Sequence, residues 1–166
     1  MTVDPVQKLN RELGDWTLIF IILTLTVRPA HELISPKLGL NRYRRMLGLF
    51  AYFYAILHLS SYVGIDLQFS WDKFYEEIIK RKFIVIGVIA VGLITPLAIT
   101  SNKRAIKRLG NKLWKKLHLL IYPAAVLGVI HFFMMVRAEF YRPLLYSAII
   151  VFLLGYRMWK FYFVRK

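Results

Sequence analysis

Long runs of uncharged, mostly apolar residues alternate with short charged connections along this chain. Three of these runs, residues 46–65, 83–102 and 117–136, contain no Asp, Glu, Lys or Arg. A helix that crosses a bilayer needs about 20 predominantly apolar residues. Each of the three runs therefore predicts a membrane span.

Two further runs predict spans when their flanks are considered. Residues 143–156 are short for a span, but Arg157 can extend its charged group to the interface from a helix that continues through Tyr162. Another run is apolar over residues 16–27, and we expect its helix to end near Ile34. The sequence thus predicts five spans.

The composition and the lengths of the runs indicate the fold class. With 58% hydrophobic residues, the chain of 166 residues is too apolar for an ordinary soluble domain. Backbone groups in lipid must be satisfied within their own segment, and the runs lack the alternation of barrel strands, so we expect helices. We predict an all-α integral membrane protein: a single domain over residues 1–166 that forms an antiparallel bundle, in which Pro96 and Pro123 bend their helices.

The net charge of +15 is distributed unevenly between the connections. Residues 35–45, 101–116 and the tail from residue 157 are rich in Lys and Arg and contain no acid, whereas residues 66–82 and 137–142 are mixed. Positive charge is retained on the cytoplasmic side of membranes. We therefore expect an external amino terminus and a cytoplasmic carboxyl terminus.

The first fifteen residues are polar and do not resemble a signal peptide, which begins with a basic segment followed by an apolar core. An external amino terminus without an export signal is unusual, so we expect relatives of this chain to begin with one further helix. The chain also has no cysteine. This excludes disulfides, thiolate ligation of haem, cysteine-ligated iron–sulfur clusters and covalent attachment of c-type haem.

Two histidines lie inside predicted spans at nearly the same depth. If both spans run outward from the cytoplasmic side, His58 lies twelve residues beyond Met46, and His131 lies fourteen residues beyond Leu117. At about 1.5 Å of rise per residue, they are roughly 18 and 21 Å from the cytoplasmic edge. Ionisable groups in hydrocarbon are costly and tend to mark a pathway or a cofactor. The pair can supply both axial nitrogens to one b-type haem held between two helices.

Two alternatives to haem ligation stay open for this pair. Each histidine can be a neutral ring that is hydrogen-bonded to a neighbouring helix. Zinc is a weaker candidate than haem iron, because zinc needs a third and a fourth ligand, and no cysteine or nearby intramembrane carboxylate offers one.

The remaining histidines are placed differently. On an ideal helix the side chain of His118 points about 140° away from that of His131, so both line one cofactor channel only if the helix is distorted near Pro123. Ligation by His118 and a solvated position at the interface are therefore both open. No second histidine lies at that level in the second span. We expect His31, at the end of the first span, to be a surface histidine.

Other chemistry is poorly represented in the sequence. There is no Gly-rich phosphate loop, no nucleophile arrangement and no nicotinamide fingerprint, so electrons would have to come from a partner or a membrane carrier. Two functions of other classes stay open. One is a small transporter or channel that uses the histidines as proton relays, and the other is a membrane anchor that docks a soluble partner.

Several short motifs together resemble those of a known family. They are the run 44–49, the run 54–58 with Ser61 and Tyr62, and then Thr100, Ser101, Leu109, Gly110, Trp114, Leu117, His118, Tyr122, Ala125 and His131. This combination covers almost the whole chain. It is similar to that of the haem-binding membrane subunits of the periplasmic methionine sulfoxide reductase system, in the ferric reductase-like transmembrane superfamily.

The resemblance implies an electron-transfer subunit in the bacterial inner membrane that carries haem b and, in family descriptions, also flavin mononucleotide (FMN). Electrons would pass from the quinone pool or a cytoplasmic flavin reductase to MsrP, a periplasmic molybdopterin enzyme that reduces methionine sulfoxide in oxidised proteins. The haem histidines of the family correspond to His58, His118 and His131. Family members usually have six spans, which implies one helix before the five described above.

Overall fold

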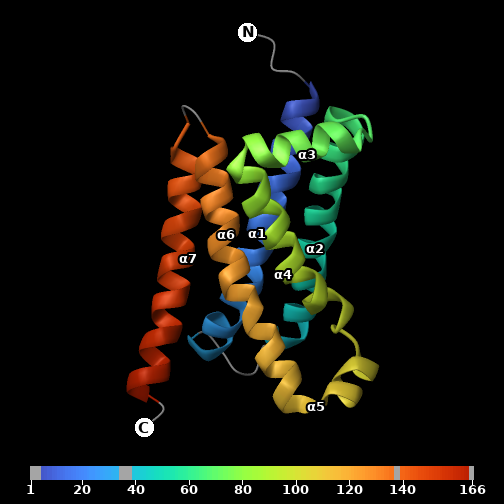
Figure 1. The fold of residues 1–166 in the computed structure, drawn as a ribbon. Coiled ribbons are helices and arrows are strands. Elements are labelled where there is room, and N and C mark those ends of the chain that lie inside the picture. The colour runs from blue at the N-terminus through green and yellow to red at the C-terminus, as the bar shows by residue number, and fades with distance from the viewer. Residues whose placement is uncertain (1–4, 34–38, 137–138, 165–166) are drawn as a thin grey trace.

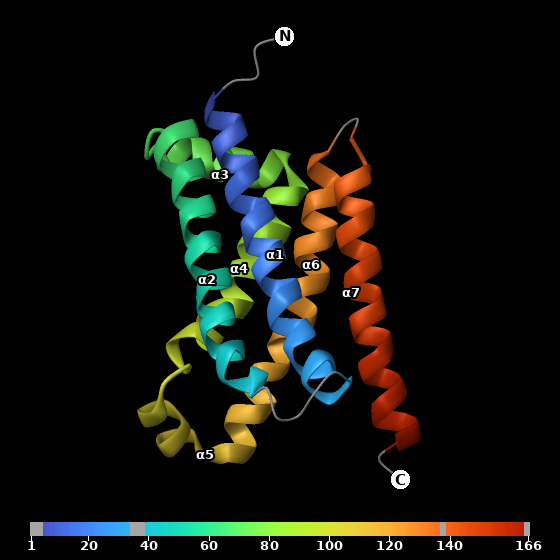
Figure 2. The same ribbon diagram turned by 180° about the vertical axis from the view of Figure 1, so that it is seen from behind.

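Five long helices run side by side along one axis in the computed structural model (Figure 1 and Figure 2). The structure describes residues 5–33, 39–136 and 139–164, and these residues contain no β-strand. The long helices are α1 (Pro5–Leu33), α2 (Tyr43–Ser61), α4 (Lys82–Ile99), α6 (Ile121–Met135) and α7 (Tyr141–Trp159). The prediction of an all-α helical bundle is confirmed.

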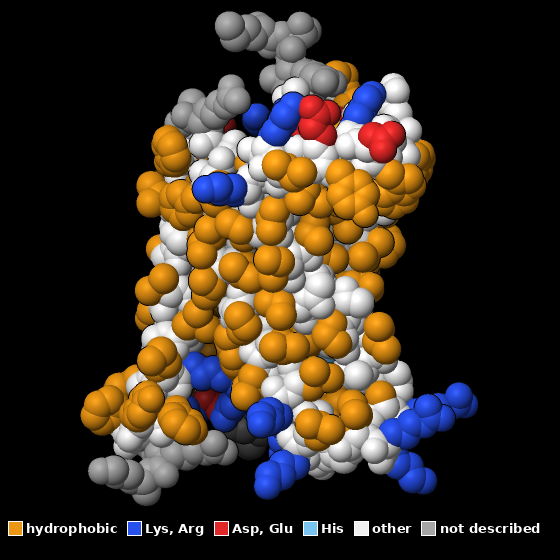
Figure 3. Space-filling model, viewed as in Figure 1, with side chains coloured by type: hydrophobic (Ala, Val, Ile, Leu, Met, Phe, Trp, Pro, Cys, Tyr) orange, Lys and Arg blue, Asp and Glu red, His pale blue; other side chains and the backbone are white. Residues whose placement is uncertain are grey.

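Five helical segments of the described chain are long and apolar enough to cross a membrane. Two of them are prolonged by π-helical turns, Tyr62–Asp66 after α2 and Lys160–Val164 after α7. On the face shown in Figure 3, hydrophobic side chains form a broad band around the middle of the bundle, and charged side chains gather toward its two ends. The chain is a multi-pass membrane protein, as predicted.

The first helix is longer than its apolar run. The prediction placed its start at Trp16, but α1 begins at Pro5, and its first turns carry the exposed residues Lys8 and Glu12. These charges lie on the turns of α1 that precede its apolar run. The expected end near Ile34 lies outside the described residues.

Two amphipathic helices cover the ends of the bundle, in segments that were predicted only as connections (Figure 1). Helix α3 (Trp71–Lys80) crosses the end at which α1 begins, here named the α3 end. Helix α5 (Lys103–Leu117) lies at the opposite end, the α5 end. The side-chain oxygen of Asn102 caps α5 by accepting a hydrogen bond from the backbone N–H of Ala105 at 2.7 Å. At Gly110 the backbone has a φ of 73°, which glycine tolerates, and α5 bends there.

The long helices pack most extensively as two pairs, α1 with α2 and α4 with α6. Small residues at the centre allow close approach: Ala51 and Ala55 on α2, and Ala124 and Ala125 on α6, are almost completely buried. Helix α2 also contacts α4, whereas α7 packs against α1 and α6. The core of the protein therefore lies where the two pairs face each other.

A tightened turn separates α5 from α6. His118–Leu120 form a 3-10 turn, and Pro123 follows near the start of α6. The distortion that was expected around Pro123 thus takes the form of a change in helix type just before it.

Candidate functional site

His58 on α2 and His131 on α6 meet between the two helix pairs, near the α3 end. Their ring centroids are 6.1 Å apart, and the ring planes are inclined at 83°. Neither residue is exposed. The fold thus brings together the two histidines that the sequence places at one depth.

Each of the two imidazoles is held by a backbone carbonyl on the other helix of its own pair. Nδ1 of His58 lies 2.9 Å from the carbonyl oxygen of Asn10 on α1. Nδ1 of His131 lies 2.7 Å from the carbonyl oxygen of Phe83 on α4. A carbonyl oxygen can only accept, so Nδ1 must carry the proton in both rings. The other ring nitrogen, Nε2, then has a free lone pair in both histidines.

This arrangement has the features of a metal-ligating pair. A histidine that binds a metal usually donates its other ring N–H to a carbonyl or carboxylate, which fixes the tautomer and the ring orientation. With two metal–nitrogen bonds of about 2 Å in line and about 1 Å more to each ring centre, the centroids of two axial imidazoles lie about 6 Å apart. The observed separation of 6.1 Å agrees with that value. Perpendicular rings also fit, because both ring planes can contain the same metal–nitrogen axis.

The number of protein side chains that can bind a metal here distinguishes haem iron from zinc. Within the described residues, no group of three or more His, Cys, Asp and Glu side chains comes together. A zinc site takes three or four protein ligands, so two imidazoles are too few. Haem iron already has four nitrogen ligands from the porphyrin and takes at most two from the protein. Two opposed imidazoles therefore suit haem iron better than zinc.

His118 lies at the α5 end, away from the pair. Its Nδ1 is 3.0 Å from the carbonyl oxygen of Trp114, and the two rings approach to 3.9 Å between centroids. Its Nε2 is buried and has no hydrogen-bond partner in the described part of the chain. The guanidinium of Arg44 on α2 is close enough to act on this ring electrostatically. His118 therefore offers a buried nitrogen without a partner among the described residues, with the cation of Arg44 nearby.

His31 lies in the last turn of α1, also at the α5 end. We predicted a surface histidine, but its Nδ1 is buried and has no partner among the residues that the structure describes. The neighbouring Glu32 accepts hydrogen bonds from Arg28 at 3.0 Å and from Lys160, in the π-helical turn after α7, at 2.5 Å. The Glu32 carboxylate is thus shared by two cations, of which Lys160 links α1 to the turn that follows α7.

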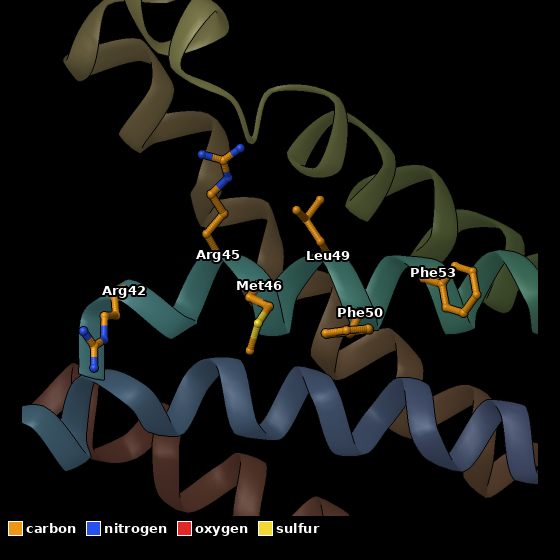
Figure 4. A pocket seen from close by; sticks show the side chains of 6 residues that line it. All are labelled: Arg42, Arg45, Met46, Leu49, Phe50 and Phe53. Carbon is orange, nitrogen blue, oxygen red and sulfur yellow. The ribbon is translucent and has the colours of Figure 1, made fainter. Parts of the chain in front are cut away.

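Two hollows in the surface lie toward the α5 end of α2 rather than at the histidine pair. One, of ≈ 500 Å³, is lined by Arg42, Arg45, Met46, Leu49, Phe50 and Phe53. In Figure 4 the six lining side chains follow one another along the helix, with the two arginines at one end and Phe53 at the other. The second, of ≈ 350 Å³, lies between α1 and the start of α2. Both are largely apolar, and neither adds a ligand to the histidine pair.

The backbone acceptors of the site could not be found from side-chain types. The carbonyl groups of Asn10 and Phe83 carry no chemical signature in the sequence. The sequence did contain one indication of them, an equal spacing: each of these residues precedes its histidine by 48 positions.

The fold and the site define a class of protein: a multi-pass helical membrane protein in which imidazoles from two helix pairs lie 6.1 Å apart between their centroids inside the bundle. Residues 13–129 match the family described as "Ferric reductase like transmembrane component". Curated relatives extend the similarity to most of the chain. The "Protein-methionine-sulfoxide reductase heme-binding subunit MsrQ" of Rhodospirillum rubrum is 45% identical over 155 residues, which make up 93% of this chain and 74% of the relative.

Proteins with the same name from two other bacteria agree with this match. The one from Xanthomonas campestris pv. campestris (strain 8004) is 43% identical over 95% of this chain and 71% of its own length. The one from Caulobacter vibrioides is 41% identical over 95% of this chain and 74% of its own length. The chain therefore belongs to the ferric reductase-like transmembrane family and, within it, to the MsrQ family.

Proposed function

We propose that this protein is the b-type cytochrome subunit of a methionine sulfoxide reductase system in the bacterial inner membrane. It binds haem b between α2 and α6, with His58 and His131 as the axial ligands. It passes electrons from the quinone pool or a cytoplasmic flavin reductase to MsrP, a periplasmic molybdopterin enzyme that repairs oxidised proteins. The names of the relatives support the haem and the reductase system.

One observation carries the proposal. Two imidazoles from different helices approach to 6.1 Å between centroids while both Nδ1 atoms are bonded to backbone carbonyls. Joining helices alone would not require two histidines of different helix pairs to lie 6.1 Å apart, each with only its Nδ1 used in the bond to the neighbouring helix. A shared metal accounts for the separation, the tautomer and the depth together.

The residues of the chain determine how such a site would work. Bound haem iron supplies one-electron oxidation and reduction. His58 and His131 would hold the iron, and the carbonyl groups of Asn10 and Phe83, which accept hydrogen bonds from the Nδ1–H groups, would strengthen both imidazoles as donors. The surrounding helices provide an apolar environment that excludes water and tunes the reduction potential.

The distribution of charge supports the proposed orientation. Helix α5 carries seven Lys and Arg residues and no acid, so the α5 end is assigned to the cytoplasm and the α3 end to the periplasm. The histidine pair then lies close to the side on which the electron acceptor is expected. The amino terminus of this chain is periplasmic and its carboxyl terminus cytoplasmic.

His118 is proposed as a further haem ligand, on the cytoplasmic half of the same path. Its buried Nε2 without a partner among the described residues and the bond from Nδ1 to the Trp114 carbonyl support this role. An FMN is expected from the family resemblance alone. The contacts among the described residues do not point to side chains that would hold it.

The test is a comparison of purified variants by pyridine haemochrome assay and reduced-minus-oxidised spectra. Wild-type protein should show b-type bands. His58→Ala and His131→Ala should lose the haem at the α3 end, and His118→Ala should lose only the haem at the α5 end. His31→Ala is the matched control and should keep all bands. Wild-type protein that shows no b-type bands after reconstitution with haem would refute the proposal.

The direction of electron flow needs a second assay. Reduced wild-type protein mixed with MsrP should be reoxidised only when a methionine sulfoxide substrate is also present. Reoxidation that does not depend on MsrP would rule out the assigned partner.

A further inference from the structure

The two helix pairs present their histidines with the same sequence spacing. Asn10 lies 48 positions before His58, and Phe83 lies 48 positions before His131. In both pairs the first helix supplies the carbonyl oxygen and the second supplies the imidazole. The two histidines are themselves 73 positions apart in the sequence.

A glycine faces the imidazole at the same place in both pairs. Gly14 and Gly87 each lie four residues after the residue that supplies the carbonyl, one helical turn further along the same helix. A Cβ atom built on Gly14 would lie 3.4 Å from the His58 ring, and one built on Gly87 would lie 2.9 Å from the His131 ring. Each ring therefore rests on the backbone of the neighbouring helix at a residue without a side chain.

The correspondence extends beyond the site. Residues 73 positions apart share a type and a buried position in both pairs: Ile21 with Ile94, and Ala51 with Ala124. Helices α1 and α4 run in the same direction, as do α2 and α6 (Figure 1). The two pairs are thus parallel structural repeats, which in membrane proteins are related by an axis along the membrane normal.

We infer that the haem site lies at the interface of an internal repeat, and that Gly87 and the Phe83 carbonyl are positioning elements for the haem ligand His131. The equivalents for His58 are Gly14 and the Asn10 carbonyl. This inference rests on the proposed function and deepens it. The carbonyl fixes the tautomer, and the glycine leaves the room in which the ring reaches its carbonyl.

The distance from the built Cβ atom to the imidazole differs between the two helix pairs, and this difference can be tested. A contact of 2.9 Å is too short for a real Cβ atom, so an alanine at residue 87 must displace the His131 ring. A contact of 3.4 Å is ordinary van der Waals packing, so an alanine at residue 14 can leave the His58 ring in place. Gly92, on the same helix as Gly87, has nothing within 4 Å of its built Cβ and is the matched control.

The first experiment measures haem affinity and the spin state of the iron in Gly87→Ala, Gly92→Ala and Gly14→Ala, after reconstitution of each purified protein. Loss of an outer-shell contact weakens metal binding by about 10- to 100-fold, so Gly87→Ala should bind haem at least about 10-fold more weakly and lose low-spin character. Gly92→Ala should match the wild type, and Gly14→Ala, whose built Cβ makes the looser contact of 3.4 Å, should lose less haem affinity than Gly87→Ala.

The second experiment tests the carbonyl without relying on the folding of Gly87→Ala. In His131→Gly, added imidazole can bind the iron and also donate its second N–H to the Phe83 carbonyl. 1-Methylimidazole has no second N–H to donate. Imidazole should restore the low-spin spectrum at a concentration about 10-fold lower than 1-methylimidazole, after correction for their affinities for free haem in detergent.

The outcomes separate the inference from the proposed function. Wild-type protein without haem would overturn both. A wild type with a low-spin haem and a Gly87→Ala protein indistinguishable from Gly92→Ala would overturn the inference alone. Equal rescue by the two imidazoles, or rescue by neither, would also overturn it.

Discussion

Asp15 on α1 accepts a hydrogen bond from Arg142 on α7 at 2.7 Å, although the two residues are 127 positions apart in the chain. The side chain of Asp15 is only 14% exposed, whereas that of Arg142 is 63% exposed. At the α5 end, Glu32 in the last turn of α1 accepts a hydrogen bond from Lys160, in the π-helical turn that follows α7. Helix α7, which packs on one side of the bundle, is thus joined to α1 by an ion pair at each end.

The pair at the α3 end should contribute modestly to stability. Because Arg142 is mostly exposed, we expect a coupling of about 0.5–1 kcal/mol between Asp15→Asn and Arg142→Gln. The measurement is a double-mutant cycle on the free energy of unfolding in detergent. Strictly additive effects of the two substitutions would show that the contact does not stabilise the fold.

The pair at the α5 end should contribute more. Glu32 accepts from Arg28 and Lys160 through its two carboxylate oxygens, so Glu32→Gln removes the negative charge opposite both cations and leaves a single acceptor oxygen. We expect a loss of about 1–2 kcal/mol in the free energy of unfolding. Glu12→Gln is the control, because Glu12 lies 4.0 Å from Lys8 in an exposed pair. If both variants unfolded alike, the junction between α1 and α7 would not have the role assigned to it.

At the proposed haem site, a variant of Asn10 can distinguish the contribution of its backbone carbonyl from that of its side chain. Its side chain accepts a hydrogen bond from Ser61 and donates one to Asp66, both at 3.1 Å, while its carbonyl oxygen holds His58. Asn10→Ala removes the side-chain bonds and keeps the carbonyl. We therefore expect a stability loss of about 1 kcal/mol with haem content unchanged. A loss of haem in this variant would indicate that the side chain positions His58.

A substitution of Trp114 should change only the spectrum of the haem proposed at the α5 end. Its indole N–H donates to the Thr100 carbonyl at 3.0 Å, and its ring packs on His118. Trp114→Phe keeps an aromatic ring but removes this donor, so we expect an altered spectrum for the haem at His118 and an unchanged one at His58 and His131. Equal changes in both spectra would argue against two separate sites.

The sequence predicts the spans well because their apolar runs are bounded by charges. It fails at the start of α1, where Lys8 and Glu12 lie on turns that precede the apolar run. A charged segment of that kind has the same composition as a loop. Helices α3 and α5 were missed for the same reason, since their polar faces place enough charge in the segment to suggest a connection.

The level of His58 and His131 was predictable from counting residues, but the way they are held was not. Their acceptors are backbone carbonyls, which every residue has, so residue types give no indication of them. His118 was judged on an ideal helix, whereas the structure places it in a 3-10 turn. Helix type within a continuous apolar run depends on tertiary packing and could not be derived from the run itself.

The most direct test of a haem shared by His58 and His131 is low-temperature electron paramagnetic resonance of the oxidised protein reconstituted with haem. Rings inclined at 83° predict a low-spin ferric signal of the strongly anisotropic kind that perpendicular axial imidazoles produce. This signal should disappear in both His58→Ala and His131→Ala and persist in His31→Ala. Its persistence in either of the first two variants would contradict the claim that these two histidines share one haem.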